Sequence, residues 1–203
     1  MLQKYGDHES AVDCFVQLLL YRLGYYSKWL NVFPQLRLKL IYGGGIVKDA
    51  IPDFTVVDVV SFLRMAVMED KKRYSDSFAN SEPQLIAELI ALSQANAADE
   101  AVQKRLPQQP VIGVCVCGMR FWFYCIDNPD CLLSAMATNT AAIQSTLVRK
   151  LGEDRNGLEF LVLEERKIII KTLDTIANSF RKQGLTAERR QSHASAESLK
   201  AVL

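Results

Sequence analysis

Three side chains near the middle of the chain have the types and spacing needed to hold a metal ion beside a phosphate. Asp53 follows Pro52, and one residue separates Glu69 from Lys71. Two close carboxylates repel each other unless a divalent cation lies between them, and hard oxygen ligands select magnesium or manganese over zinc. Such an ion polarises a phosphoryl oxygen, and a nearby lysine can orient the attacking water or neutralise charge that develops on the phosphate.

Each half of this pattern also has an ordinary structural interpretation. A Pro-Asp pair is common at the start of a strand, and a Glu-x-Lys at a strand end is more often a solvated pair of side chains. The chemical hypothesis therefore depends on two adjacent strands that bring Asp53 and Glu69 side by side. Glu69 and Lys71 share one face of a strand, and Asp70 lies on the other.

Hydrophobic periodicity predicts the elements that would position these residues. Apolar residues at helical spacing predict a helix over about 9–24 and a second one over about 81–104, with Ser81 and Gln84 spaced as a capping box. The glycine triplet 43–45 is interpreted as a hairpin turn rather than a phosphate-binding loop, because no Lys-Ser pair or helix follows it. Alternation and turn residues predict five strands, at 36–42, 51–60, 63–70, 111–117 and 121–126.

The order of these elements predicts an α/β fold with a mixed five-stranded sheet. An antiparallel meander, a helix crossover and a hairpin follow one another, and helices flank the sheet. Further helices are expected over about 130–149 and 158–182. We expect a core over residues 1–127, a helical extension over 128–183 packed on that core, and a disordered tail over 184–203.

Composition is that of an ordinary globular domain. The 203 residues are 49% hydrophobic and 23% charged, and the formal net charge is +1, so one core is expected and disorder of the whole chain is excluded. A net charge near zero neither indicates nor excludes nucleic-acid binding, because a local basic patch is enough. No apolar stretch is long enough for a membrane span, and the N-terminus has no signal-peptide core.

The cysteines predict a reducing compartment. Their number is five, which is odd, and without a signal peptide this favours an intracellular location in the nucleus or cytoplasm. Cys115 and Cys117 are interpreted as small buried apolar residues rather than zinc ligands, because the chain has only two histidines and neither is close to them in sequence.

Pro52-Asp53 and Glu69-x-Lys71 together resemble the PD-(D/E)XK signature of the restriction-endonuclease-like nuclease superfamily. Two downstream segments are similar to the helix and hairpin that follow the catalytic strand in fungal and oomycete members, which include Crinkler-type effector domains. These segments are QLIAELIAL at 84–92 and VIGVCVCGMRFWFY at 111–124. The resemblance covers roughly residues 9–127 and implies a restriction-endonuclease-like core.

The resemblance also implies roles for individual residues. Magnesium or manganese would be held by Asp53, Glu69, the backbone carbonyl of Asp70 and an additional acid, Glu9. The catalytic residues would be Asp53, Glu69, Lys71 and Gln84. Lys72 and Arg73 would contact phosphates. Some of these assignments have structural alternatives. Glu9 could be a carboxylate favoured at a helix start, and Gln84 could be a capping residue. Lys72 and Arg73 could belong to a solvated loop.

The function that follows is a divalent-metal-dependent nuclease, acting as an endonuclease or exonuclease, with DNA expected ahead of RNA. The alternative is a catalytically inactive binding or effector domain that keeps the nuclease fold and acts through nucleic acid or protein partners, since fold does not fix function. No membrane partner is expected. The C-terminal helices leave a homodimer open, and a purely structural interaction module is a third alternative.

Overall fold

A computed structural model describes residues 9–42, 45–59, 64–71, 78–100, 102, 110–138, 148–151 and 157–200. For some of these only the backbone is described, namely 9–10, 64–71, 78–81, 132, 135–138, 149 and 183–200.

Within this described part, seven strands form one mixed sheet. They are β1 (Leu30–Pro34), β4 (Phe54–Asp58), β5 (Arg64–Lys71), β6 (Val111–Cys117), β7 (Arg120–Ile126), β8 (Val148–Leu151) and β9 (Leu158–Glu159). A separate two-stranded hairpin contains β2 (Leu38–Tyr42) and β3 (Ile46–Ala50). The helices are α2 (Glu9–Arg22), α3 (Phe78–Ala98), α5 (Pro129–Thr138) and α6 (Leu163–Lys200).

The sheet is built from a meander, a crossover and a hairpin in that order. β1, β4 and β5 are antiparallel neighbours, α3 leads from β5 to the parallel β6, and β7 returns antiparallel beside β6. β8 and β9 both pair with β7. A parallel pair requires a long crossover, and α3 supplies it.

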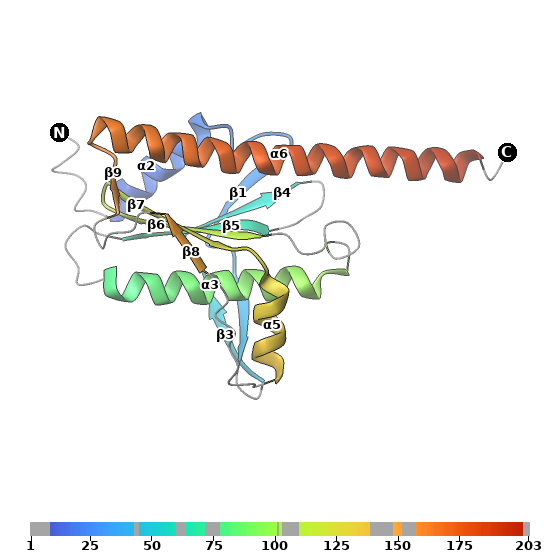
Figure 1. Cartoon of the computed structure of the whole chain (residues 1–203), viewed down its shortest axis with the longest axis horizontal. Coiled ribbons are helices and arrows are strands. Elements are labelled where there is room, and N and C mark those ends of the chain that lie inside the picture. Colours follow the sequence, from blue (N-terminus) through green and yellow to red (C-terminus); the bar gives the residue numbers. More distant parts are fainter. Residues whose placement is uncertain are drawn as a thin grey trace.

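Helices cover both faces of this sheet (Figure 1). α2 and α6 lie on one face, and α3 lies on the other. The β2–β3 hairpin extends beyond α3, away from the sheet (Figure 1). Since successive residues of a strand point to opposite faces, β6 and β7 divide their side chains between two cores. Val114, Val116, Phe121 and Phe123 face α2 and α6, whereas Cys115, Cys117, Trp122 and Tyr124 face α3.

The segment that follows α2 contacts α6 on the first of these faces. The buried Tyr25 hydroxyl donates to the carbonyl of Leu173, 2.8 Å away. Arg181 Nη2 donates to the carbonyls of Leu23 at 2.7 Å and Gly24 at 3.0 Å. These two carbonyls follow the end of α2, where Gly24 has φ 73°, so an arginine of α6 caps the C-terminal end of α2.

The structure confirms the α/β class and corrects several elements. The first strand of the meander is β1, a segment for which the sequence patterns predicted no strand, and the segment 36–42 instead contains β2 in the separate hairpin. The main sheet has seven strands rather than five because β8 and β9 extend it beyond β7. The hairpin turn predicted at the glycine triplet agrees with the antiparallel pairing of β2 and β3.

Helix boundaries differ as well. α3 begins at Phe78, so Ser81 lies inside the helix and is not its capping residue. The helix predicted over 130–149 is the shorter α5, and its expected last residues, 148 and 149, belong to β8. α6 continues to Lys200, so residues 184–200 are helical rather than the disordered tail predicted from sequence. No helix among the described residues combines the length and apolarity needed to cross a membrane.

Candidate functional site

The antiparallel pairing of β4 and β5 places Asp53 near Glu69. Phe54 is opposite Met68 and Thr55 is opposite Val67. Asp53 directly precedes β4, and the same register continued by one step would set it opposite Glu69. Residues directly opposite each other in an antiparallel pair share a face of the sheet, with Cβ atoms about 4.5–5.5 Å apart. The hairpin geometry that the chemical hypothesis requires is therefore compatible with the observed register.

The pairing of β5 with β6 identifies which face this is. Glu69 is in register with Cys115 and Lys71 with Cys117, and both cysteines belong to the core beneath α3. Glu69 and Lys71 thus occupy register positions on the α3 side of the sheet. Asp70, in register with Val116, occupies the opposite side, where only its backbone is available to the candidate site.

Asp53 lies at a bend in a long ribbon. β1 pairs with β4 as far as Pro34 and Phe54, and the Gln35 amide then donates to the Asp53 carbonyl at 3.1 Å. Gln35 has φ 50°, a left-handed conformation that is uncommon for a residue with a side chain. Beyond this point the same two chain segments continue as β2 and β3. The backbone of Asp53 is therefore fixed where the ribbon leaves the sheet, and its side chain remains partly exposed.

α3 contributes a buried acid that the sequence analysis did not select. Glu88 is only 2% exposed, and its Oε1 accepts a hydrogen bond from Gln84 Nε2 at 3.1 Å. A carboxylate is rarely buried to this extent unless it has partners or a function. A signal was present in the sequence, since Glu88 is spaced i+3 from Leu85 and i−4 from Leu92, inside the apolar stripe of the helix.

Helix periodicity places Glu88 on the flank of α3 that faces β5. Leu85 and Leu89 lie under β6, because a Cβ added to Gly113 would meet their side chains at 3.1 and 2.9 Å. At about 100° per residue, Ile86 and Ile90 then point to one flank and Glu88 to the other. Ile86 and Ile90 line a cavity together with Tyr124 of β7 and Val148 of β8. Because β5 and β7 are the two neighbours of β6, the opposite flank of α3, which carries Glu88, faces β5.

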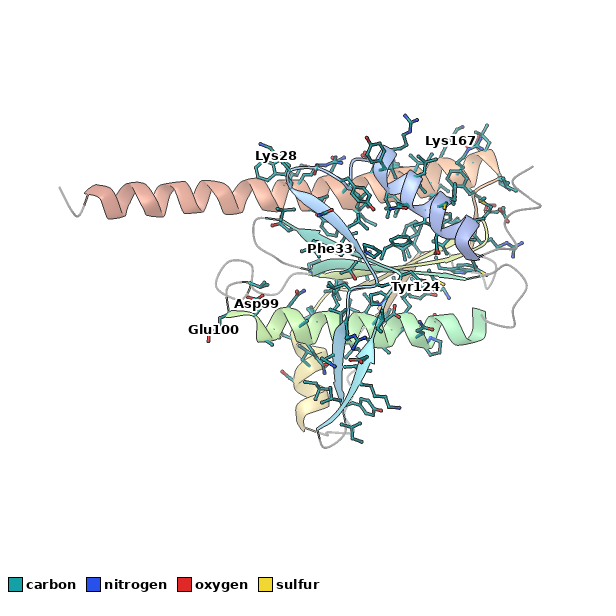
Figure 2. The ribbon with its side chains drawn as sticks, turned by 180° about the vertical axis from the view of Figure 1, so that it is seen from behind. Lys28, Phe33, Asp99, Glu100, Tyr124 and Lys167 are labelled. Carbon is teal, nitrogen blue, oxygen red and sulfur yellow. The ribbon has the colours of Figure 1, made fainter. Side chains whose placement is uncertain are left out.

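A cavity of about 690 Å³ lies on the flank of Ile86 and Ile90, away from Asp53. Its lining includes Glu82, Ile86, Ile90, Tyr124, Val148 and Lys150. Lys150 Nζ is 3.2 Å from Glu82 Oε1 and 5.2 Å from the centre of the Tyr124 ring, and Tyr124 lies on the α3 side of the sheet (Figure 2). Burial, followed by the nearby Glu82 carboxylate, raises the pKa of the Tyr124 phenol, which therefore stays neutral.

Thr55 adds a second buried polar group to the α3 side, two residues after Asp53. Its side chain is fully buried, and its Oγ1 makes no hydrogen bond within the described part of the chain. Thr55 is opposite Val67, two positions from Glu69. A buried hydroxyl without a hydrogen bond costs free energy, so Thr55 stabilises this side of the sheet less than an apolar side chain of the same shape would.

The remaining predicted site residues are described only in part. Gln84 is exposed and bonded to Glu88, and Glu9 is the first residue of α2. The structure describes only the backbone of Glu9, Glu69, Asp70 and Lys71. Lys72 and Arg73 lie outside the described residues. Among the described side chains, to which those of β5 do not belong, no three of His, Cys, Asp or Glu converge as a metal-binding group.

Comparisons with protein-family models, with curated proteins and with solved structures find no match for this chain. The likeness to PD-(D/E)XK nucleases therefore rests on the residues and on the arrangement of the elements that carry them.

Proposed function

We propose that this protein is a divalent-metal-dependent nuclease with a restriction-endonuclease-like core that hydrolyses phosphodiester bonds, with DNA as the favoured substrate. The observation that carries the proposal is the register of β4 on β5. Continued by one step, it pairs Asp53 with Glu69, and the parallel pairing with β6 sets Glu69 and Lys71 on the same side as the buried Glu88.

The order of the elements also supports this proposal. The resemblance implies a meander, a helix crossover and a hairpin, and β1, β4, β5, α3, β6 and β7 follow in that order within the larger sheet. The first strand is β1 rather than the predicted 36–42. The next two strands are close to those predicted: β4 spans Phe54–Asp58 rather than 51–60, so Asp53 directly precedes it, and β5 spans Arg64–Lys71 rather than 63–70.

The donor set fits magnesium or manganese. Asp53 and Glu69 supply hard carboxylate oxygens from opposite positions, and the backbone carbonyl of Asp70 lies between Glu69 and Lys71. Such an ion, when bound, would polarise the phosphodiester and lower the pKa of a coordinated water.

Lys71 would donate a hydrogen bond to the attacking water or to the phosphate oxygen on which charge develops, and it would not be a metal ligand. Gln84, held by Glu88 at 3.1 Å, would orient a polar group of the substrate from the α3 side. Hydrolysis joins the water oxygen to phosphorus and breaks the bond to the leaving oxygen, which takes up a proton.

The test is a cleavage assay with plasmid, single-stranded DNA and RNA in magnesium or manganese. Lys71→Ala should lower the cleavage rate about 10²- to 10³-fold, because it removes one well-placed electrostatic group, and manganese binding by calorimetry should be retained. Asp53→Ala should lose both cleavage and manganese binding. Lys72→Ala is the matched control, with the same charge change one residue further on, and it should retain most of the rate.

Two results would overturn the proposal or its details. If Lys72→Ala is as damaging as Lys71→Ala, the assignment of Lys71 is wrong. If the wild-type protein cuts none of these substrates with either metal, the protein is a binding domain on a nuclease-like scaffold instead of an enzyme.

A further inference from the structure

The β2–β3 hairpin stands apart from the main sheet as a two-stranded ribbon. One face packs on α3 through the buried Leu38 and Ala50, and Gln94 of α3 holds the backbone of Ile41 by two hydrogen bonds, at 2.8 and 2.6 Å. In Figures 1 and 2 the ribbon crosses α3 and extends beyond it. Its position is thus fixed by packing on α3, while its second face is turned away from the protein.

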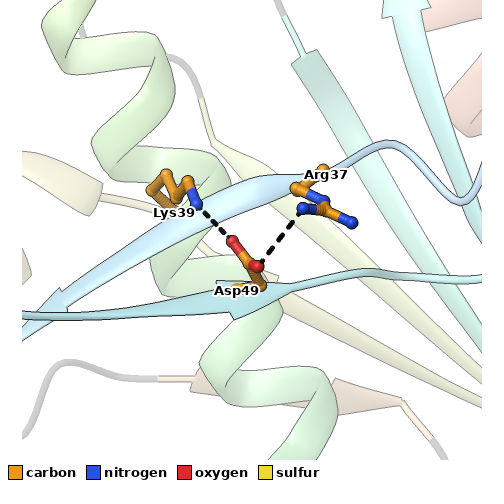
Figure 3. Close-up of polar contacts among 3 residues, drawn as sticks. All are labelled: Arg37, Lys39 and Asp49. Carbon is orange, nitrogen blue, oxygen red and sulfur yellow. Dashed lines mark hydrogen bonds and ion pairs between the residues drawn. The ribbon is translucent and has the colours of Figure 1, made fainter.

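This second face is basic and apolar. Lys39 Nζ donates to Asp49 Oδ1, and Arg37 Nη1 lies 3.6 Å from Asp49 Oδ2. Figure 3 shows Lys39 of β2 and Arg37, which directly precedes β2, converging on this one carboxylate of β3, with α3 behind them. The side chains of Arg37 and Lys39 are 67% and 59% exposed. Further along the ribbon, Ile41 and Val47 are paired across the two strands, and both are exposed.

Charge distinguishes the ribbon from the rest of the chain. Residues 36–51 include three basic side chains and one acidic side chain, a net charge of +2, although the whole chain has +1. Lys48 is opposite Leu40, on the face of Leu38 and Ala50, so Arg37, Lys39 and Asp49 give the second face a net charge of +1. The hydrogen bond from Lys39 is the main reason that the pKa of the Asp49 carboxyl lies below its ordinary value. Asp49 therefore stays ionised and holds Arg37 and Lys39 next to each other as a pair of cationic donors.

The ribbon is continuous with the candidate site. Two residues, Ile51 and Pro52, join β3 to Asp53, and the Gln35–Asp53 backbone hydrogen bond of 3.1 Å closes its base. A ligand held along the ribbon is thereby placed at a fixed distance from Asp53.

We propose that the β2–β3 hairpin is a substrate-gripping arm, in which Arg37 and Lys39 bind the phosphate backbone of duplex DNA and position it for the site at Asp53. The choice of duplex DNA as the ligand rests on the proposed nuclease function. A two-stranded ribbon fits the major groove of B-form DNA, which is about 12 Å wide. Paired cations on an exposed surface supply the sequence-independent part of such binding.

The experiment measures binding separately from cleavage. Full-length protein is titrated into a fluorescently labelled 30-base-pair duplex in EDTA, and anisotropy gives the affinity at several salt concentrations. Removing two phosphate contacts in Arg37→Ala/Lys39→Ala should weaken binding on the order of tenfold and lower the salt slope by about 1–2. Lys167→Ala is the control, because Lys167 is also exposed and ion-paired, 2.8 Å from Glu164, but lies on α6 across the sheet.

The DNA affinity of Asp49→Asn distinguishes a phosphate-binding role of Arg37 and Lys39 from a purely structural role of their ion pairs. Asp49 competes with phosphate for the two cations, so its neutralisation should tighten binding about two- to fivefold. If the cluster only stabilised the hairpin, the same change would loosen the ribbon and weaken binding. Glu164→Gln is the matched control for this charge change and should leave the affinity as it is.

The outcomes separate this inference from the proposed function. If the hairpin variants bind like their controls while cleavage still depends on Lys71, the arm is refuted and the nuclease remains. If binding depends on the hairpin but nothing is cleaved, the arm remains and the nuclease is refuted. A wild-type dimer in sedimentation that Ile41→Ser converts to a monomer, together with unchanged DNA binding, would assign the exposed face to a second copy of this chain instead.

Discussion

The two faces of the sheet are built from different kinds of residue. The face beneath α2 and α6 contains an apolar, aromatic core in which the rings of Phe15, Phe121 and Phe160 lie within 6.3 Å of one another, centre to centre. The face beneath α3 contains Thr55 and Glu88 as well as cysteines, and the register positions of Glu69 and Lys71 belong to it. The face beneath α2 and α6 is mostly apolar, with the buried Asp58, opposite Leu30, as an acidic exception, whereas the α3 side has buried polar groups on both the sheet and the helix.

Under the proposed nuclease function, this difference separates stability from function within one sheet. Changes to apolar residues on the α2 and α6 side should act on the free energy of unfolding alone. Changes to polar groups on the α3 side should act on cleavage, and some should leave the protein as stable as before or more stable, as expected where a site is maintained at the expense of stability.

The largest effect is expected from Phe121→Ala. Phe121 is 1% exposed, and three other phenylalanine rings lie within 6.4 Å of it, centre to centre, so truncation should lower the free energy of unfolding by about 3–5 kcal/mol in urea denaturation. Phe33→Ala is the control, because Phe33 is exposed on β1, and it should cost well under half as much. Equal losses would mean that the aromatic face is not the main source of stability.

Glu88→Gln should affect the rate of cleavage rather than the fold. If Glu88 orients Gln84 beside the substrate, its neutral isostere should lower the rate about 10- to 100-fold and change the free energy of unfolding by less than about 1 kcal/mol. The control is Glu82→Gln, on the same helix but on the cavity flank beside Lys150, which should keep the rate. A larger loss in Glu82→Gln would place the site on the other flank of α3.

Gly113→Ala tests how closely α3 approaches the sheet. A Cβ at this position would meet Leu89 Cδ1 at 2.9 Å and Leu85 Cδ2 at 3.1 Å, and such overpacking should lower the free energy of unfolding by about 1–3 kcal/mol. Leu89→Ala should cost less in the Gly113→Ala background than alone, because it removes the clash. Additive losses would indicate that the two side chains do not compete for this space.

Thr55→Val should produce the smallest change, in the opposite direction. Valine keeps the shape of threonine and removes a buried hydroxyl that has no hydrogen bond within the described residues. The free energy of unfolding should therefore rise by up to about 1 kcal/mol in urea denaturation. Destabilisation by a similar amount would show that the hydroxyl has a partner among the side chains of β5 that lie outside the described ones.

Local patterns predicted the elements around the candidate site better than those far from it. The alternation in 111–117 and 121–126 identified β6 and β7, and short connections gave the pairing of β4 with β5. The pairing of 36–42 was wrong, because its true partner, Ile46–Ala50, is mostly exposed and lacks the apolar alternation of a core strand. β8 was missed for a similar reason, since a four-residue edge strand following α5 leaves little periodicity to detect.

The antiparallel pairing of β4 with β5, on which the candidate site depends, was predicted from the sequence, and the site itself stays a prediction. Asp53, Glu69 and Lys71 could be grouped because two neighbouring strands fix their relative positions. Glu88 was not selected, because sequence spacing alone does not show which flank of a helix lies against which strand. Only the contact of Leu85 and Leu89 with Gly113 settles the rotation of α3 about its axis.

The cap that Arg181 places on the end of α2 has a consequence for the order of events during synthesis. The contacts of Arg181 with Leu23 and Gly24 and of Tyr25 with Leu173 join residues 148 to 158 positions apart. The ribosome therefore releases the whole sheet before α6 is available to cover it. Until then the aromatic face is exposed to solvent and to other nascent chains. A chaperone that binds apolar surfaces would therefore have more time to bind this face than the face beneath α3.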